Sequence, residues 1–411
     1  MRKTHTKNTL RYYFIVILLL IFLFFSGDFG MIDVQKTAIV MAVGVDRQED
    51  TFIVTSQIAI PQSSKQGGAS ETVQLVSRGK TVADAFEEIN EKTGWYPKLV
   101  FCRLIVLGEK AAQENVFDAL DFFLLDEYMS DNCLLATCDG LAKDILNVTA
   151  LVDKSGSVAM QKVLSHHAER VGTVLPATLR EFSIGYFSDS KSGFLPILKT
   201  QPQQEHVGGE TQNGSGGTQN AGDAGGGQNQ NGGQNASGSS QEKPVFSASE
   251  TALFVLGKRV GKLTEEQTFA FNAVKKELRL ATYTLQTPDA ACSLSIKRNT
   301  PKIKVSLGAN GQACVRISLK LSAGLLDYSK TLPADKAADG GDVPDGVFFS
   351  AEKLLASQIH ETFEKCKNAN CDIFGVGEHL QKHEKKAYPQ IKDDALKTAT
   401  LEVHVSFENV R

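Results

Sequence analysis

One segment in the middle of the chain limits, more than any other feature, what the chain can fold into. Residues 201–245 consist mainly of glycine, asparagine, glutamine and serine, with almost no side chain that could enter a core. Such a composition cannot offset the conformational entropy lost on ordering. We therefore predict a flexible linker here. It separates an N-terminal α/β region at 31–200, which could divide into two subdomains, from a C-terminal α+β domain at 246–411.

Residues 1–30 form a segment of a different kind. Four basic residues between Arg2 and Arg11 precede an unbroken apolar run at 12–25. This order is typical of membrane targeting and leaves the basic flank on the cytoplasmic side. The residues predicted to form the membrane anchor include Tyr12, Phe14, Leu18, Leu20, Phe24 and Phe25.

The length of this apolar run leaves two outcomes open. Its 14 residues are fewer than the roughly 20 of a typical spanning helix, which favours a cleaved signal peptide. Residues 26–30, however, contain no pair of small residues separated by one position, as a signal-peptide cleavage site requires. We therefore favour an uncleaved anchor, with the following residues outside the membrane. No cysteine follows the run directly, so we predict no lipidation site.

Charge and cysteine content exclude some partners and leave one question open. The 411 residues carry a net charge of -3, whereas binding to a phosphate backbone depends on many Lys and Arg contacts. We therefore expect no nucleic-acid partner. Seven cysteines, an odd number, cannot all pair within one chain. Most of them lie in apolar stretches typical of buried thiols, but Cys366 and Cys371 could form a disulfide.

The motifs that would indicate an enzyme are incomplete. The stretch GVGEHL at 375–380 lacks the third glycine of a dinucleotide fingerprint. His379 and His383 share a helix face, but Glu378 precedes the first histidine, where a zinc protease needs the glutamate after it. We therefore expect no catalytic, cofactor-binding or metal-binding residues, and a protein that is not an enzyme.

Hydrophobic periodicity predicts alternating strands and helices in the first region. Strands are expected at 37–45 and 52–60, where they would form a hairpin. A helix is expected at 81–91, followed by a strand at 98–107 and a long helix at 109–128. These elements indicate a mixed α/β fold.

The second region shows the pattern of a sheet covered by helices. Strands at 251–256 and 259–263 predict a hairpin with Gly257 at the first central position of its turn. Apolar residues then alternate with polar ones in three stretches between 292 and 321, which is typical of antiparallel strands. A long amphipathic helix around Leu355, Ile359 and Phe363 and a final strand at 401–407 complete an expected antiparallel sheet with helices on one side.

Several short motifs, taken in their order, carry a resemblance to a known family. They are TAIVMAVGVD at 37–46, GKTVADA at 79–85, LIVLGEKAA at 104–112, GFLPIL at 193–198 and CDIFGVGEHLQKH at 371–383, followed by Tyr388 and Pro389. This order resembles the Ger(x)C family, the C subunits of spore germinant receptors. The chain departs from that family in three ways: it lacks the lipobox cysteine and the Trp-Asp type of start, and it carries the long insertion at 201–243.

The resemblance implies a membrane-held, extracytoplasmic protein that acts with integral-membrane receptor subunits in nutrient-triggered germination. It implies a multi-domain ectodomain of mixed sheets with packed helices behind the N-terminal membrane segment. Contact with the germinant, a small molecule, would be indirect. Because the lipobox cysteine is missing, residues 12–25 themselves would hold the chain to the membrane. The rival hypothesis is a secreted solute-binding or cell-envelope interaction protein, released after signal cleavage.

Overall fold

The computed structural model describes residues 3–25, 37–59, 72–148, 155–165, 171–201, 245–275, 278–286, 290–308, 310–329, 343 and 346–410. Its helices are α1 (Lys3–Phe25), α2 (Val82–Thr93), α3 (Glu109–Gln113), α4 (Phe117–Leu125), α5 (Ala142–Leu146), α6 (Gly156–Val163), α8 (Leu179–Phe187), α9 (Glu265–Lys275), α11 (Val347–Asn368), α12 (Val376–His383) and α13 (Tyr388–Ile391). Its strands are β1 (Thr37–Gln48), β2 (Thr51–Ala59), β3 (Thr72–Gly79), β4 (Tyr96–Lys98), β5 (Leu104–Leu107), β6 (Leu134–Cys138), β7 (Ala177–Thr178), β8 (Ser192–Gln201), β9 (Val245–Val255), β10 (Lys258–Leu263), β11 (Ala281–Gln286), β12 (Ala291–Leu307), β13 (Ala313–Tyr328) and β14 (Thr400–Asn409).

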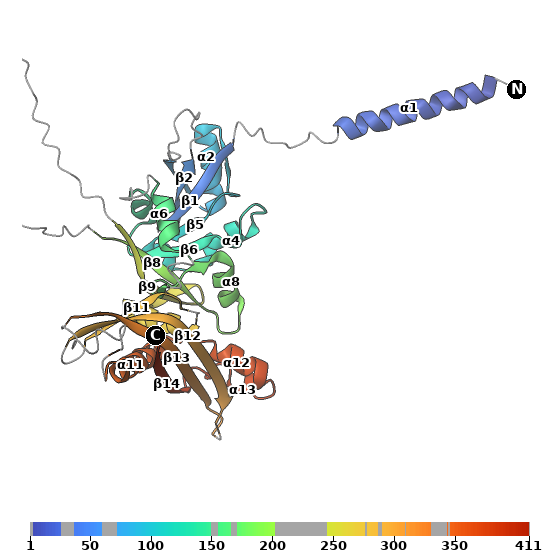
Figure 1. Cartoon of the computed structure of the whole chain (residues 1–411). Helices are drawn as coiled ribbons and strands as arrows, with labels where there is room; N and C mark the ends of the chain where they lie inside the picture. Colours follow the sequence, from blue (N-terminus) through green and yellow to red (C-terminus); the bar gives the residue numbers. More distant parts are fainter. Residues whose placement is uncertain are drawn as a thin grey trace, which may run out of the picture.

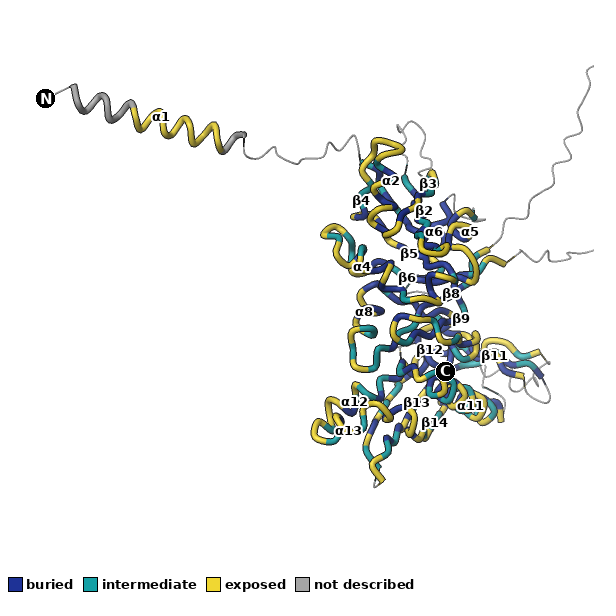
Figure 2. Tube along the Cα trace, turned by 180° about the vertical axis from the view of Figure 1, so that it is seen from behind, coloured by how far each residue is buried: buried dark blue, intermediate teal, exposed yellow. Residues whose placement is uncertain are grey.

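The larger of two sheets runs in the order β10-β9-β8-β6-β5-β1-β2-β3, with β4 paired to β1 and β7 paired to β6. Its middle strands β1, β5, β6 and β8 are parallel, and antiparallel strands extend it on both sides. Helices α2, α4 and α8 cover one face and α5 and α6 the other (Figure 2). The predicted mixed α/β fold is confirmed for this part of the chain.

Local signals account for several of these elements. The hairpin expected from strands at 37–45 and 52–60 is present as β1 and β2. Thr81 caps α2, because its side chain accepts a hydrogen bond from the Asp84 backbone at 3.1 Å. Gly94 ends this helix in the left-handed conformation, with a φ of 70°. At the start of α9, the Thr264 and Gln267 side chains each accept a hydrogen bond from the other residue's backbone N–H, which forms a capping box.

The sheet crosses the boundary expected between the two folded regions. Strand β9 pairs with β8 in antiparallel register from Ser192↔Val255 to Gln201↔Val245, so the chain leaves the sheet after Gln201 and returns to the neighbouring strand at Val245. Strands β9 and β10, which we had assigned to the second region, are therefore part of the first sheet. Residues 202–244 lie outside the described residues; in chain order they connect the two strands of one antiparallel pair.

The second sheet has the order β11-β12-β13-β14, and its apolar side packs against α9 and α11. The predicted helix is α11, with Leu355, Ile359 and Phe363 buried. The prediction of a wholly antiparallel sheet was wrong for one pair: β14 runs parallel to β13, from Cys314↔Thr400 to Ala323↔Asn409. The reason is the connection, because α11 crosses back over the sheet between the two strands. Figure 1 shows this domain at the opposite end of the molecule from β1 and α2.

Three shorter predictions need correction. The helix expected at 109–128 is broken into α3 and α4, because the Val116 backbone N–H donates to Gly257 O at 2.9 Å and the Asn115 side chain accepts from the Phe117 N–H. The strand expected at 98–107 is likewise divided into β4 and β5. In the turn between β9 and β10 the residues with positive φ are Leu256 and Gly257, so the glycine takes the second central position rather than the first.

The cysteines are all free thiols, and the disulfide left open between Cys366 and Cys371 is absent. Six of the seven are buried, and only Cys314 is partly exposed. Cys366 and Cys371 instead belong to the large apolar core of the C-terminal domain. The interpretation of these residues as small buried apolar groups therefore holds for all but Cys314.

The N-terminal helix α1 contains the whole predicted anchor. Of its residues with described side chains, Tyr12 and Phe14 are each 70% exposed, and Leu18 and Leu20 are also exposed. The side chains of Phe24 and Phe25 lie outside the described set. Among the described residues, no helix combines the length and hydropathy needed to cross a membrane. The buried residues, dark blue in Figure 2, lie mainly along the two sheets.

The pairing of β8 with β9 predicts the effect of shortening the segment between them. We expect that replacing residues 202–244 with a four-residue turn raises the free energy of unfolding by about 2 kcal/mol, because closing a short loop costs less entropy than closing a long one. Urea unfolding followed by circular dichroism would measure the change. Loss of folding in this variant would contradict the pairing, since a short turn could not then join the two ends.

A cluster of charges on the strands that flank this segment predicts a pH dependence. Burial disfavours the charged form of Glu250, but hydrogen bonds from Lys199 and Lys262, with N–O distances of 2.7 and 2.9 Å, outweigh it and lower its pKa below the ordinary 4.5. The stabilisation is present above that ordinary pKa and is lost as pH falls through the lower folded value. We therefore expect Glu250→Gln to cost up to about 1 kcal/mol at pH 7 and to approach wild-type stability near pH 3, measured by urea titration.

Candidate functional site

The loop between α11 and α12 joins the C-terminal domain to the first sheet. The Cys371 thiol donates to the carbonyl oxygen of Phe254 at 3.3 Å, and the Asp372 backbone N–H donates to Ser192 Oγ at 2.9 Å. Phe254 lies in β9 and Ser192 begins β8. The loop therefore contacts the two strands that flank residues 202–244, and the motif stretch at 371–383 lies where the two sheets meet.

The Asp372 carboxylate organises this loop. Its two oxygens accept hydrogen bonds from the backbone N–H groups of Val376 at 2.8 Å and Gly377 at 2.7 Å, at the start of α12. An anion in this position satisfies free helix amides and complements the helix dipole. Burial raises the pKa of Asp372 above the ordinary aspartate value, and the hydrogen bonds from Gly377 and Val376 oppose this rise.

Two glycines allow the loop to close on this carboxylate. Gly375 takes a φ of 74°, in the left-handed region that side chains other than glycine rarely adopt. A Cβ atom on Gly377 would lie 3.3 Å from an Asp372 carboxylate oxygen and 3.6 Å from the Tyr388 hydroxyl. The Gly-x-Gly spacing of the motif thus has a packing reason and needs no bound phosphate.

A second set of polar contacts lies beside the first. Asp189, in the loop between α8 and β8, accepts hydrogen bonds from Gln381 at 3.1 Å and from the Tyr388 hydroxyl at 3.2 Å. Burial, reinforced by the negative charge of Asp189, raises the pKa of Tyr388 to about 12. Both donors belong to the C-terminal domain, so the hydrogen bonds to Asp189 form a second connection between that domain and the first sheet.

A hollow of about 730 Å3 lies next to these contacts, between α8, the start of β8 and α12. Its lining includes Phe187, Lys275 and Glu378, together with Asp372 and Tyr388. Burial raises the pKa of the Cys371 thiol to about 12, and both Asp372 oxygens are engaged by backbone amides. These groups are therefore committed to structure, and the arrangement suits a contact surface better than acid–base or nucleophilic chemistry.

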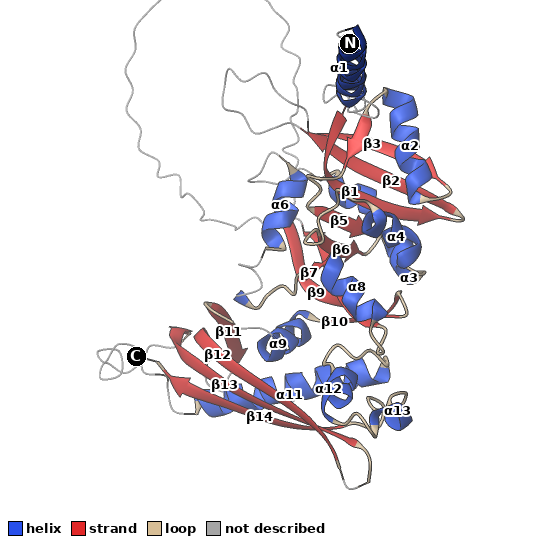
Figure 3. Cartoon of the chain, turned by 90° about the vertical axis from the view of Figure 1, so that its right-hand side faces the viewer, coloured by secondary structure: helices blue, strands red, loops and turns tan. Residues whose placement is uncertain are grey.

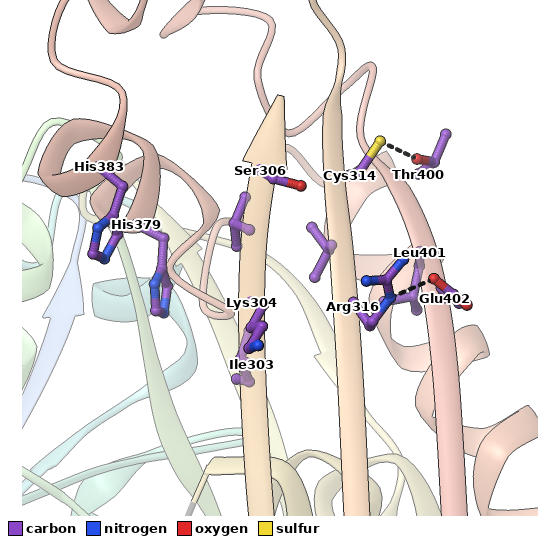
Figure 4. Close-up of a pocket in the computed structure, with 12 residues that line it drawn as sticks. Ile303, Lys304, Ser306, Cys314, Arg316, His379, His383, Thr400, Leu401 and Glu402 are labelled. Atoms are coloured by element: carbon purple, nitrogen blue, oxygen red, sulfur yellow. Dashed lines mark hydrogen bonds and ion pairs between the residues drawn. The ribbon is translucent and has the colours of Figure 1, made fainter. Parts of the chain in front are cut away.

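A smaller groove of about 500 Å3 lies between α12 and the β12–β14 sheet (Figure 4). His379 and His383 project from α12 on one side of the groove, with ring centroids 6.4 Å apart. On the opposite side, Arg316 donates to Glu402 at 2.6 Å across β13 and β14. These two charges neutralise each other, and Lys304 adds a further positive charge to the lining of the groove.

The histidine pair does not form part of a metal centre in the residues that the structure covers. No group of three or more His, Cys, Asp or Glu side chains there could hold an ion. Cys314 lines the same groove, but Thr400 donates to its sulfur at 3.5 Å. The two histidines share a helix face, as their spacing predicts, and that face borders the groove.

The motifs of the first region also have structural explanations. Asp46, at the end of TAIVMAVGVD, is buried, and its carboxylate accepts hydrogen bonds from Ala142 N at 2.7 Å and Lys143 N at 3.0 Å, so it caps α5. Gly108, in LIVLGEKAA, approaches this carboxylate so closely that a Cβ atom would clash with it. Sequence reasoning singled out these residues, but it missed Ser192 and Asp189, which lie 180 and 199 residues before their partners Asp372 and Tyr388.

Both halves of the chain match known protein families. Residues 30–200 match the family model described as "Spore germination protein N-terminal domain", and residues 249–411 match "Spore germination B3/GerAC like, C-terminal". Spore germination protein A3 of Bacillus subtilis (strain 168) is 26% identical over 175 residues, which are 41% of this chain and 46% of that protein. Spore germination protein B3 of the same organism is 26% identical over 149 residues, 35% of this chain and 37% of that protein.

These two alignments span less than half of each relative's length. Among solved structures, the "Crystal Structure of the GerBC protein" superposes with a TM-score of 0.51 and 15% sequence identity, covering 90% of this chain and 97% of that chain. At this identity the likeness is one of fold. It agrees with the two mixed sheets and packed helices described above.

The junction around Asp372 predicts a loss of stability on mutation. We expect Asp372→Ala to lower the free energy of unfolding by about 1–3 kcal/mol, because two backbone N–H groups in a half-buried place would lose their acceptor. Asp121→Ala, an exposed aspartate on α4, is the matched control and should change stability by less than about 0.5 kcal/mol. Equal stability of the two variants, measured by urea unfolding, would show that the junction does not depend on this carboxylate.

Proposed function

The chain belongs to the Ger(x)C family of spore germination proteins, and from this membership we propose that it acts as the membrane-anchored, extracytoplasmic C subunit of a spore germinant receptor. The observation that carries the proposal is the order of the two family domains, which together account for most of the chain. Its partners would be a transporter-like subunit and a further membrane subunit. Its role would be to help couple nutrient sensing to germination.

The described contacts support a role in positioning and interaction rather than catalysis. The carboxylates within the motif stretches, such as Asp372 and Asp46, accept hydrogen bonds from backbone amides of their own chain. In the hollow of about 500 Å3, the charged pair Arg316 and Glu402 is satisfied internally. We therefore propose that small-molecule germinants act on this subunit indirectly, by way of its partner subunits.

We further propose that α1 holds the protein in the membrane without a lipid. Its sequence has the basic flank and continuous apolar run of an anchor, and the described part of that run has exposed side chains. Tethering in the plane of a membrane keeps the ectodomain at a high effective concentration beside other membrane subunits, so weak contacts suffice for assembly. The spore inner membrane or the cytoplasmic membrane, with the ectodomain on its outer side, is the proposed location.

Capture from spore membranes tests the assembly. We expect the full chain, tagged at its C-terminus and expressed in a spore former, to retrieve at least one multi-span membrane protein from detergent-solubilised spore membranes. A matched chain in which a cleavable signal peptide replaces residues 1–30 should retrieve at least tenfold less, because it lacks the shared membrane. Mass spectrometry of the captured proteins gives the readout.

Two results would contradict the proposal in different ways. Capture of no multi-span protein by the full chain would count against the receptor assignment. Recovery of a mature chain that begins near residue 28 from the soluble external fraction would instead refute the anchor and favour the secreted solute-binding or cell-envelope protein.

A further inference from the structure

The densest run of exposed large apolar side chains outside α1 lies between residues 95 and 128. We define the Trp95 surface by six of them, namely Trp95, Tyr96, Val100, Phe101, Leu125 and Tyr128. Trp95 is 43% exposed, Phe101 49% and Leu125 82%. Single exposed apolar residues are normal on a protein surface, but a cluster of aromatic and aliphatic ones indicates a contact with a partner or a membrane.

The Trp95 surface stands on a fixed framework. Phe86 of α2 stacks on Phe122 of α4, with ring centroids 5.0 Å apart, so the helix that precedes Trp95 packs against the helix that ends at Leu125. The Lys98 ammonium lies 4.7 Å from the ring centroid of Tyr128, which connects β4 to the segment after α4. The exposed side chains therefore project from packed elements, and Figure 2 shows exposed segments beside both helices.

The turn between β4 and β5 exposes two large apolar side chains. The Cys102 backbone N–H donates to Leu99 O at 2.8 Å, which closes a turn with Val100 and Phe101 at its two central positions. Leu99 and Cys102 are buried, whereas the two central side chains are exposed. Exposed turns usually carry glycine, proline, asparagine, aspartate or serine at these positions. A valine and a phenylalanine there would be protected from water only by something that covers the surface.

The location of this surface identifies what covers it. Tyr96, at the start of β4, pairs with Thr37, the first residue of β1 and the point where the described ectodomain begins. Eleven residues separate Thr37 from Phe25, the last residue of α1, so even a fully extended connection spans no more than about 40 Å. The Trp95 surface thus begins at the end of the ectodomain to which the connection from α1 leads, away from α11 (Figures 1 and 3).

From these observations we propose that the Trp95 surface rests on the lipid bilayer, with Trp95, Tyr96 and the Val100–Phe101 turn at the level of the headgroups. The proposal rests on the anchoring by α1 proposed above. Tryptophan and tyrosine are enriched at this depth because their rings are apolar and their N–H and O–H groups stay hydrated. Charges of both signs border the surface, such as Lys98 and Asp126, so the contact depends on apolar and aromatic groups and does not need anionic lipid.

The single tryptophan of the chain makes the proposal directly measurable. The full chain would be reconstituted into phosphatidylcholine vesicles and into matched vesicles with bromine atoms on the upper acyl chains, which quench nearby indoles. We expect the protein to float with both kinds of vesicle and the Trp95 emission to fall by about half in the brominated ones, because an interfacial ring lies within about 5–10 Å of the acyl boundary. High salt should leave this ratio unchanged.

Two variants serve as controls. Trp95→Phe combined with Phe349→Trp moves the fluorophore to an exposed position on α11, at the far end of the molecule, where bromine should not quench it. Val100→Asp combined with Phe101→Asp keeps Trp95 and alters only the exposed turn. That variant should still float but lose most of the quenching, since two carboxylates would be driven out of the interface.

The outcomes separate this proposal from the one on which it rests. If the chain floats but bromine leaves Trp95 emission unchanged, the anchor holds and the lipid contact is refuted, which would leave the surface to a protein partner. If the chain does not float, the anchor itself fails and the lipid contact fails with it. Equal quenching of Trp95 and of the tryptophan at position 349 would also overturn the proposal, because it would reflect no particular orientation.

Discussion

The antiparallel pairing of β8 with β9 is the contact on which the rest of the structure depends. Alternate side chains of β9 enter different cores: Phe254 joins the core under α2, α4 and α8, and Leu253 joins the core of the C-terminal domain. The Phe254 carbonyl also accepts a hydrogen bond from the Cys371 thiol, and the hydroxyl of Ser192 at the start of β8 accepts one from the Asp372 N–H. If β9 left β8, both cores and the junction between the sheets would be opened together.

Local patterns were enough to predict most elements, because their causes are local. The Gly94 helix end, the Thr264 cap and the buried face of α11 each depend on residues within one or two turns of chain. The errors arose where a distant residue decided the outcome. Gly257 accepts the hydrogen bond that breaks the expected helix at Val116, and the assignment of β9 to the first sheet depends on a partner on the other side of 43 residues.

The candidate site was only half predictable for the same reason. The motif around Asp372 is visible in the sequence because its glycines and its carboxylate act within six residues of each other. Asp189 and Ser192 give no such signal, since one is an ordinary polar residue of a loop and the other the first residue of a strand until the fold brings them to the motif. The Trp95 surface was likewise invisible, because an apolar residue in a sequence predicts burial, and only the structure separates exposed Phe101 from buried Leu99.

The buried free thiols have a consequence for the extracytoplasmic location proposed above. Burial raises the pKa of Cys138, Cys366 and Cys371, so these sulfurs stay protonated and react slowly with oxidants and with other disulfides. The chain can therefore reach and keep its fold in an oxidising compartment without help from a disulfide-forming enzyme. Oxidation of these three thiols would become possible only after a core has opened, so their oxidised forms would be a chemical record of past unfolding.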